Sequence, residues 1–275
     1  VGPNTVTLTA SDVNGNSATC TGIVTVLDTI PPNAVCQNVT VQLDATGNGT
    51  TSASDVNNGS SDNCGIALIQ ISDSTFDCSD VGLNVVLFGA LDVNGNLDTC
   101  FAQVLVVDTV PPVAVCQNIT VQLDAGGNAT ITASDVDGGS SDACGIAGLS
   151  ATPTSFSCSN VGANTVTLTV TDVNGNAATC TSTVTVEDNV APVAICQDLT
   201  VQLDASGSVT ITGADVDNGS SDACGIASLT VSPATFNCSN VGANTTTLIV
   251  TDVNGNTSTC TSTITVEDTV PPVAI

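Results

Sequence analysis

The chain of 275 residues contains no Lys, Arg or His, and its 24 Asp and 2 Glu give a formal net charge of −26. Nucleic acids and anionic membranes attract basic side chains, so the composition excludes both as expected partners. A general base would have to be a carboxylate, and without Trp or Tyr the chain has no aromatic-lined cleft for paired acids, so we expect no catalytic residue and no enzyme.

The string Asp-Val-Asn-Gly-Asn begins at Asp12, Asp92, Asp172 and Asp252, a spacing of 80 residues each time. This period is too long for a solenoid unit and long enough for a small domain. We therefore expect tandem modules joined by Pro-stiffened linkers. The predicted boundaries are the C-terminal part of a module in 1–28, complete modules in 31–108, 111–188 and 191–268, and the start of another in 269–275.

Within 111–188, the alternation of apolar residues with Thr and Gln predicts β-strands and no helix. In chain order, the expected elements are a strand at 119–123, a turn at 124–128, a short strand at 130–133, an acidic loop at 134–145, strands at 146–152, 155–158 and 166–170, a hairpin turn at 172–176 and a last strand at 180–186. Six or seven short strands with frequent turns indicate an all-β fold of β-sandwich modules. The modules are poor in aromatic residues, and each complete module has a Phe at the same position for its thin core, namely Phe76, Phe156 or Phe236.

Thirteen cysteines follow the same period, four to a module, which indicates an oxidising compartment and disulfide-stapled modules. The odd number fits a window cut from a longer array, in which the partner of Cys20 precedes residue 1. Four cysteines allow three pairings, and their spacing alone does not choose between them. A zinc site is disfavoured because no two cysteines have the close C-x2-C spacing.

Three sets of oxygen-bearing side chains are candidate calcium ligands, because hard cations prefer carboxylate and amide oxygens. The first is Asp172 with Asn174 and Asn176, for which a self-capped hairpin turn is the alternative interpretation. The second is the acidic loop, for which the alternative is a solvated, solubilising segment; its residues are Asp135, Asp137 and Asp142, with Asp215, Asp217 and Asp222, and with Asp55, Asn57 and Asp62. The third lies at the module junctions and consists of Asp28, Asp108, Glu187 with Asp188, and Glu267 with Asp268.

The segments Pro111–Val121, Ser141–Gly145 and Val161–Asp172, followed by Gly175-Asn176, Cys180 and Thr183–Val186, resemble the hyalin repeat (HYR) family. The resemblance implies tandem immunoglobulin-like sandwiches in an extracellular, adhesive protein. It also implies a disulfide between the first and last cysteine of each module, and makes the two middle cysteines the expected second pair. The implied pairs are Cys36–Cys100 with Cys64–Cys78, Cys116–Cys180 with Cys144–Cys158, and Cys196–Cys260 with Cys224–Cys238.

Long arrays of this kind look most like giant surface adhesins of Bacteroidetes-type bacteria, including gliding-motility adhesins. Thr29, Thr109 and Thr269 each follow Asp and precede an aliphatic residue, which resembles the O-glycosylation signal of these bacteria. The resemblance therefore predicts a glycosylated, calcium-binding stalk at the cell surface that projects a distal binding tip with an unknown ligand. Neighbouring modules of the chain and other copies in a filament are the expected partners. Two alternatives stay open: self-association into a fibre or sheath, and multivalent binding of glycan or protein by the modules themselves.

Overall fold

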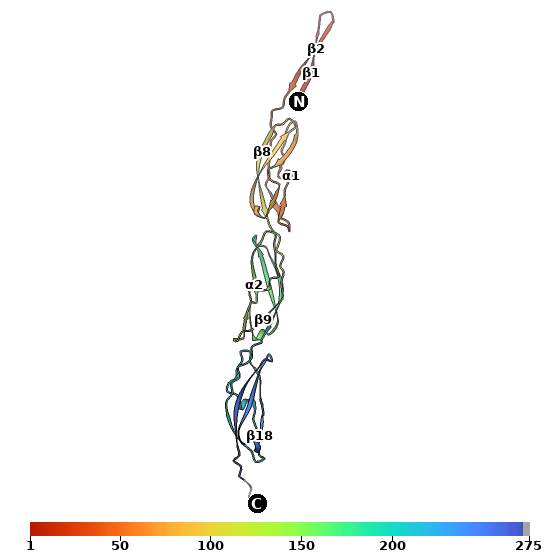
Figure 1. Ribbon diagram of the computed structural model, residues 1–275. Helices are drawn as coiled ribbons and strands as arrows, with labels where there is room; N and C mark the ends of the chain where they lie inside the picture. The colour runs from red at the N-terminus through yellow and green to blue at the C-terminus, as the bar shows by residue number, and fades with distance from the viewer. Residues whose placement is uncertain (272–275) are drawn as a thin grey trace. The chain divides into compact units, whose positions relative to one another are not determined.

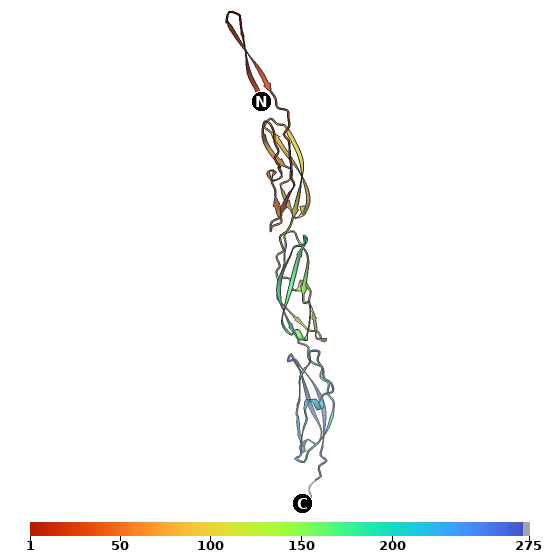
Figure 2. The same cartoon turned by 180° about the vertical axis from the view of Figure 1, so that it is seen from behind.

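The computed structural model describes residues 1–271, and its regular structure is almost entirely β-strand, as the alternating pattern predicts. The segment 191–268 contains β15 (Leu199–Gln202), β16 (Ser208–Thr210), α3 (Gly213–Val216), β17 (Ile226–Ser232), β18 (Thr235–Asn237), the 3-10 turn η3 (Cys238–Asn240), β19 (Gly242–Asp252) and β20 (Thr257–Glu267). Figure 1 shows these elements at the blue end of the chain, and Figure 2 gives the reverse view.

The same order of elements occurs twice more. Residues 111–188 contain β9 (Ile119–Gln122), β10 (Asn128–Thr130), α2 (Ala133–Val136), β11 (Ile146–Thr152), β12 (Ser155–Ser157), η2 (Cys158–Asn160), β13 (Gly162–Asp172) and β14 (Ala177–Glu187). Residues 31–108 contain β3 (Val39–Gln42), β4 (Asn48–Thr50), α1 (Ala53–Val56), β5 (Ile66–Ile71), β6 (Thr75–Asp77), η1 (Cys78–Asp80), β7 (Gly82–Asp92) and β8 (Leu97–Val107). Before them stands the hairpin of β1 (Gly2–Ser11) and β2 (Ser17–Val26).

Each repeat combines a four-stranded sheet with a two-stranded sheet. In residues 191–268 the larger sheet has the order β15-β20-β19-β17, and the smaller one pairs β16 with β18. All of these pairings are antiparallel except β15 with β20, which run parallel with Leu199 opposite Ile264. Strand alternation then turns every second side chain of β19 and β20 toward the core. This arrangement is an immunoglobulin-like β-sandwich, as the resemblance implies.

The core of each repeat is small and aliphatic. In residues 191–268 it is built around Phe236, with Leu248 and Val250 from β19 and Ile264 and Val266 from β20. The corresponding Phe76 and Phe156 are buried as well. Large aromatic residues are otherwise almost absent, so the hydrophobic free energy comes mainly from Val, Leu and Ile at about 25 cal/mol for each Å² removed from water.

The acidic loop contains a short helix that the periodicity did not predict. Residues Ala133–Val136 form α2, and Ala53–Val56 and Gly213–Val216 form its counterparts α1 and α3. Four residues are too few to show a 3.6-residue apolar period, which explains why the sequence pattern missed them. The helix has an N-terminal capping box instead: in α1, the side chains of Ser52 and Asp55 each accept a hydrogen bond from the other residue's backbone N–H.

The described residues group into two compact units. The first holds residues 1–112 together with the loops 142–147 and 172–176, and the second holds 113–141, 148–171 and the residues from 177 onward. Two loops of the 111–188 repeat therefore belong to the unit that contains 31–108. The expected start of a further module at 269–275 falls mainly on residues 272–275, which lie outside the described residues.

Candidate functional site: disulfides and carboxylates at the repeat boundaries

Three disulfides close loops within single repeats. Cys36 pairs with Cys100, Cys116 with Cys180, and Cys196 with Cys260, each over a sequence separation of 64 residues. These are the first-to-last pairs that the resemblance implies. In residues 191–268 the bond joins the segment before β15 to the middle of β20, where Cys260 faces Leu248 across the hairpin. We call these three bonds the intra-repeat disulfides.

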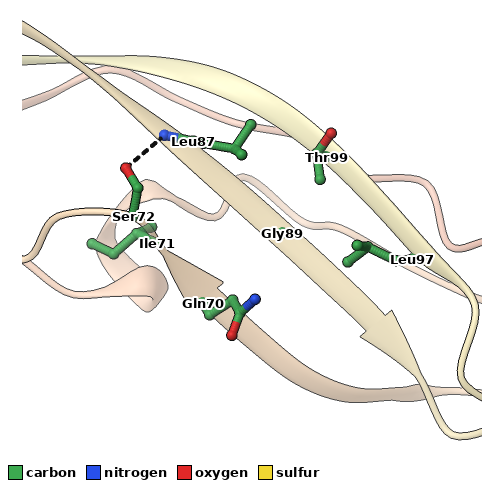
Figure 3. Close-up of a pocket in the computed structure, with 7 residues that line it drawn as sticks. All are labelled: Gln70, Ile71, Ser72, Leu87, Gly89, Leu97 and Thr99. Carbon is green, nitrogen blue, oxygen red and sulfur yellow. Dashed lines mark hydrogen bonds between the residues drawn. The ribbon is translucent and has the colours of Figure 1, made fainter.

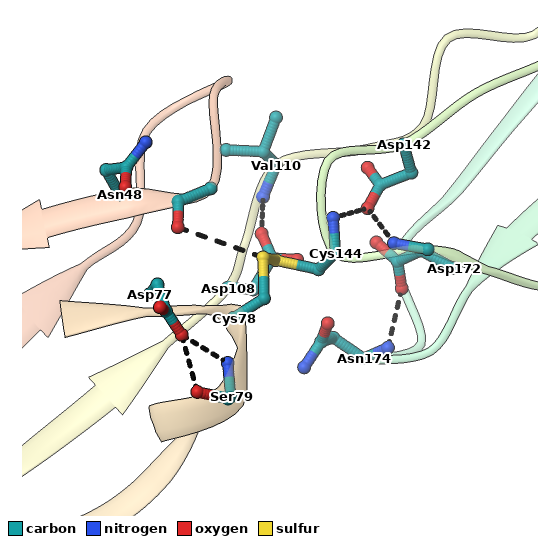
Figure 4. Close-up of a disulfide and its surroundings, with 12 residues drawn as sticks. Asn48, Asp77, Cys78, Ser79, Asp108, Val110, Asp142, Cys144, Asp172 and Asn174 are labelled. Carbon is teal, nitrogen blue, oxygen red and sulfur yellow. Dashed lines mark hydrogen bonds between the residues drawn. A yellow bond between two sulfur atoms is a disulfide. The ribbon is translucent and has the colours of Figure 1, made fainter.

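The remaining disulfides differ from the expected pairs. Cys144 does not bond Cys158; it bonds Cys78 of the preceding repeat, with their Cα atoms 5.1 Å apart. Cys158 in turn bonds Cys224 of the following repeat, also at a Cα separation of 5.1 Å. We call Cys78–Cys144 and Cys158–Cys224 the inter-repeat disulfides. Figure 4 shows the first of them, with Asp108 and Asp142 beside the sulfur atoms.

The sheet explains why the expected bond cannot form within a repeat. Cys224 lies just before Ile226, which is the register partner of Asp252 at the last residue of β19. Cys238 begins η3, only a few residues before Gly242 at the first residue of β19. An 11-residue strand is roughly 35 Å long, whereas a disulfide requires Cα atoms within about 7 Å. The two cysteines therefore stand at opposite ends of their own sandwich.

A glycine makes room for each inter-repeat disulfide. A Cβ atom added to Gly127 would lie 2.6 Å from the Sγ atom of Cys158 and 3.2 Å from the Cβ atom of Ala223. Gly127 also has a φ of 73°, in the left-handed region that side chains other than glycine disfavour. Gly47 has the same role beside Cys78, with an added Cβ atom 2.7 Å from the Sγ atom. The turns before β4 and β10 are thus shaped to receive the bond.

Three cysteines of the described part are free and exposed: Cys20, Cys64 and Cys238. The predicted bonds of Cys64 with Cys78 and of Cys238 with Cys224 are therefore absent, because Cys78 and Cys224 are already bonded to other repeats. A side-chain hydrogen bond with the Asp28 carboxylate is the main cause that raises the pKa of the Cys64 thiol, and partial desolvation and the negative charges of Asp28 and Asp62 add to it. Cys64 is consequently a poor thiolate nucleophile at neutral pH.

The Asp-Val-Asn-Gly-Asn string forms the self-capped hairpin turn that was the alternative to a calcium loop. The Oδ1 atom of Asp172 accepts hydrogen bonds from the backbone N–H groups of Asn174, at 2.9 Å, and Asn176, at 2.8 Å. Its Oδ2 atom accepts a third from the Asn176 amide at 2.8 Å. Burial would raise the pKa of Asp172, but these hydrogen bonds outweigh it, and the pKa lies below its ordinary value.

Sequence reasoning missed a second bond of the last Asn in this string. The Asn176 amide also donates to the backbone carbonyl of Asp108, at 3.2 Å, in the linker that precedes the repeat. Asn256 donates in the same way to the carbonyl of Asp188 at 3.0 Å, and Asn96 to that of Asp28 at 3.3 Å. The exact recurrence of Asn at this position was the available signal. The turn thus fastens the linker to the repeat that follows it.

The structure does not keep the three predicted sets of calcium ligands apart. It brings one residue of the acidic loop beside one junction residue, so that ligand atoms lie within 4.8 Å of one another in three clusters: Asp28, Asp62 and Cys64; Asp108, Asp142 and Cys144; Asp188, Asp222 and Cys224. In Figure 4, Asp108 and Asp142 lie near Cys144, and Asn174 of the hairpin turn lies below them. The hairpin turn, the acidic loop and the junction therefore each contribute a residue to the region around Cys144.

The other acidic-loop residues are engaged in local turns. Asp215 accepts hydrogen bonds from the backbone N–H of Thr212, at 2.6 Å, and from its hydroxyl, at 2.7 Å. Asp217 accepts from the N–H of Ser220 at 3.0 Å. The Thr212 side chain lowers the pKa of Asp215, and the Ser220 side chain lowers that of Asp217. One repeat earlier, Asp135 accepts from the N–H of Thr132 and Asp137 from that of Ser140. In residues 31–108, Asp55 accepts from the N–H of Ser52.

The predicted glycosylation sites Thr29, Thr109 and Thr269 are all exposed. The hydroxyl of Thr269 donates to Gln202 at 2.8 Å. None of the described helices has the length and hydrophobicity needed to span a bilayer.

A shallow hollow lies on the outer face of the sheet in residues 31–108. It is lined by Gln70, Ile71, Ser72, Leu87, Gly89, Leu97 and Thr99, and Figure 3 shows that Gly89 contributes no side chain at its centre. The Ser72 hydroxyl already accepts a hydrogen bond from the backbone N–H of Leu87 at 3.1 Å. The hollow therefore presents mainly apolar side chains.

Comparison with known proteins gives one family match and one curated relative. The HYR domain model matches residues 107–186. Hyalin from Strongylocentrotus purpuratus is 32% identical over 293 aligned residues, which cover 99% of this chain and 24% of hyalin. The chain thus spans about a quarter of the length of this relative.

The solved structures that match the chain have low sequence identity to it and TM-scores below 0.4. The protocadherin fragment PcdhgB3 EC1-4 has a TM-score of 0.36 at 12% identity, and the alignment covers 98% of this chain and 84% of that one. The three titin domains I67-I69 give 0.35 at 12% identity, with 86% and 99% covered. Sidekick-1 immunoglobulin domains 1-5 give 0.37 at 10% identity, with 94% and 66% covered. The match of residues 107–186 to the HYR domain and the similarity of the chain to hyalin both support HYR-like tandem repeats.

Proposed function

We propose that this chain is a tension-bearing segment of an extracellular, adhesion-type protein, in which it separates a surface attachment from a distal binding region. The observation that carries the proposal is the inter-repeat disulfide. Cys78–Cys144 and Cys158–Cys224 bond successive repeats to one another in addition to the backbone. The HYR-like sequence supports an adhesive, extracellular setting.

The five disulfides create two covalent routes along the array. One route passes through the intra-repeat disulfides and the linkers between them, such as the 16 residue steps from Cys100 to Cys116. The other passes through the inter-repeat disulfides and the 14 residue steps from Cys144 to Cys158. The first route uses the linkers, and the second uses β11 and β12. The loss of one disulfide therefore leaves the other route intact.

The two routes limit how far the array can lengthen under force. An extended chain spans at most about 3.5 Å per residue, so a fully unfolded repeat of 80 residues would reach roughly 280 Å. With the disulfides closed, each repeat contributes only 14 or 16 residue steps to a route, which is about 50 to 55 Å. Unfolding of the sandwich thus adds little length, and the array acts as a tether of nearly constant reach.

The same proposal includes attachment to a cell surface and glycosylation of the chain. Its finer parts are a bacterial surface, glycans on Thr29, Thr109 and Thr269, and a separate ligand-binding tip, and these rest on the sequence resemblance alone. Intact mass spectrometry of protein taken from its native host tests the glycans. A mass equal to that of the bare polypeptide would remove them from the proposal.

Electron microscopy of cells labelled with an antibody to one repeat tests the tether directly. We expect label at regular intervals along thin projections that leave the surface. A continuous coat of label would instead support the fibre or sheath. Sedimentation of the isolated chain with its free thiols alkylated is the companion measurement, because a tether predicts a monomer and a sheath predicts self-association. Alkylation blocks accidental bonding through the exposed Cys20, Cys64 and Cys238 and leaves the disulfides closed.

A further inference from the structure

The cluster of Asp188, Asp222 and Cys224 lies where the end of one repeat meets the loops of the next. Ligand atoms of the three residues are within 4.8 Å of one another. The sulfur of Cys224 is bonded to Cys158, so it is no thiolate and the two carboxylates are the ligands of interest. The Asn256 amide holds the backbone carbonyl of Asp188 beside them, at 3.0 Å.

Asp188 carries an unsatisfied oxygen in this cluster. Its side chain is only 7% exposed, and its Oδ1 atom accepts a hydrogen bond from the N–H of Val190 at 3.1 Å. Its Oδ2 atom is buried and has no hydrogen-bond partner. Asp222 directs its Oδ1 atom to the N–H groups of Cys224, at 2.7 Å, and Gly225, at 3.2 Å. Buried charges in proteins are normally paired, and this chain has no Lys, Arg or His to pair with them.

The same arrangement occurs one period earlier. Asp108 and Asp142 are clustered, and the Oδ2 atom of Asp108 is again buried without a partner. The Oδ1 atom of Asn174, in the hairpin turn of that repeat, is also buried and unpartnered. The earliest copy differs, because the Asn94 amide donates to the Oδ2 atom of Asp28 at 2.8 Å and satisfies it. In the two later copies, the Oδ2 atoms of Asp108 and Asp188 thus accept no hydrogen bond.

We propose that a calcium ion binds between Asp188 and Asp222, and a second between Asp108 and Asp142 with Asn174 as an added ligand. The available ligands are carboxylate and amide oxygens, which hard divalent cations prefer, and water completes the larger and more flexible coordination shell of calcium. Two protein carboxylates correspond to the weak end of the calcium range, with Kd about 10⁻⁴ to 10⁻³ M as in extracellular modules.

Such an ion has a defined mechanical effect. It joins Asp188 of the linker to the loop that carries Cys224, next to the inter-repeat disulfide. The linker is then fixed at three points: the ion, the Asn256 hydrogen bond and the disulfide. The site does not depend on the tether proposal, because calcium binding by the isolated chain is measured without any cell surface.

Equilibrium dialysis of the whole chain against radioactive calcium, at constant ionic strength, tests the proposal. We expect two saturable sites, which Asp188→Asn reduces to one and Asp188→Asn with Asp108→Asn reduces to none. Asp268→Asn is the matched control, because Asp268 occupies the same repeat position and also accepts from its Val270 N–H, at 3.1 Å, but is exposed and belongs to none of the three clusters. It should retain both sites.

Thermal melting separates a binding defect from a folding defect. In chelator, Asp188→Asn should melt at the same temperature as the wild-type chain or higher, because it removes one of two neighbouring negative charges. In calcium, the wild-type chain should melt several degrees higher than in chelator, and the variant should gain less. Absence of saturable calcium binding, binding of magnesium alone, or full stoichiometry in Asp188→Asn would each overturn the proposal.

Discussion

Removal of the central intra-repeat disulfide tests the pairing through the stretched length of the chain. In the wild-type array the shortest covalent route from Cys36 to Cys260 uses the three intra-repeat disulfides and two 16-residue linkers, so 32 residue steps replace the 224 of the backbone. At about 3.5 Å per step, this route is roughly 110 Å long, against about 780 Å for the reduced chain.

The double variant Cys116→Ser, Cys180→Ser forces the load onto the inter-repeat disulfides. The shortest route then has 22 steps back from Cys100 to Cys78, 14 steps from Cys144 to Cys158, and 28 steps back from Cys224 to Cys196, which is 64 in all. The fully stretched variant should therefore exceed the wild-type chain by 32 steps, or about 110 Å. Loss of folding stability in the variant leaves this value unchanged, because it depends only on which covalent bonds have formed.

Single-molecule force spectroscopy, with handles at the two ends of the chain, measures this difference as contour length. If Cys144 were bonded to Cys158, the route would have 82 steps, and the variant would exceed the wild type by about 175 Å. If neither middle cysteine were bonded, it would have 96 steps and exceed the wild type by about 220 Å. Either of these lengths would refute the inter-repeat disulfides. A reductant should bring both chains to the same length.

Three further changes probe the repeat boundaries. Gly127→Ala should leave thiols of Cys158 and Cys224 open to alkylation, because the new Cβ atom would lie 2.6 Å from a sulfur; Gly139→Ala, which has a positive φ but open space, should leave none. Asn176→Ala removes hydrogen bonds to the Asp172 carboxylate and the Asp108 carbonyl, and urea denaturation should show a loss of about 2 kcal/mol, against less than about 0.5 for Val173→Ala in the same turn. Hydrogen bonds keep the pKa of Asp172 below its ordinary value, so its contribution to stability is complete above the unfolded-state pKa of about 3.9 and is lost as pH falls through the folded-state pKa. The melting temperature should fall from pH 5 to 2 and fall less steeply in Asp172→Asn; equal slopes would contradict this origin.

Much of the fold follows from local sequence signals. The alternation of Val166, Leu168 and Val170 with Thr predicted β13, and all three side chains are fully buried. The Asn-Gly signal at 174–175 predicted the hairpin turn, since Gly175 has the positive φ that such turns need. These features depend on residues that are close in sequence. The alternation along several short strands predicted the sandwich fold, and the 80-residue repeat predicted that Phe76, Phe156 and Phe236 occupy the same core position.

The inter-repeat disulfides could not be predicted in this way, because they depend on which end of the sandwich each cysteine occupies. Along the chain, Cys144 is only 14 residues from Cys158, whereas its partner Cys78 is 66 residues away. Sequence distance therefore favoured the wrong bond. The same reason hid the carboxylate clusters: Asp142 appeared to belong with Asp135 and Asp137, but the loop places it beside Asp108, and the other two cap local turns.

The inter-repeat disulfides also set a condition on how the protein is made. In an unfolded chain, closing a loop of 14 residues costs less entropy than closing one of 66, by about 1.4 kcal/mol, so random oxidation favours Cys144–Cys158. As the chain emerges from its N-terminal end, Cys158 must also wait for residue 224. Correct pairing therefore requires that each sandwich fold before Cys144 and Cys158 can bond each other, and that Cys158 stay reduced until the next repeat supplies Cys224. Biogenesis of the array is thus sequential, and each repeat is completed only by its successor.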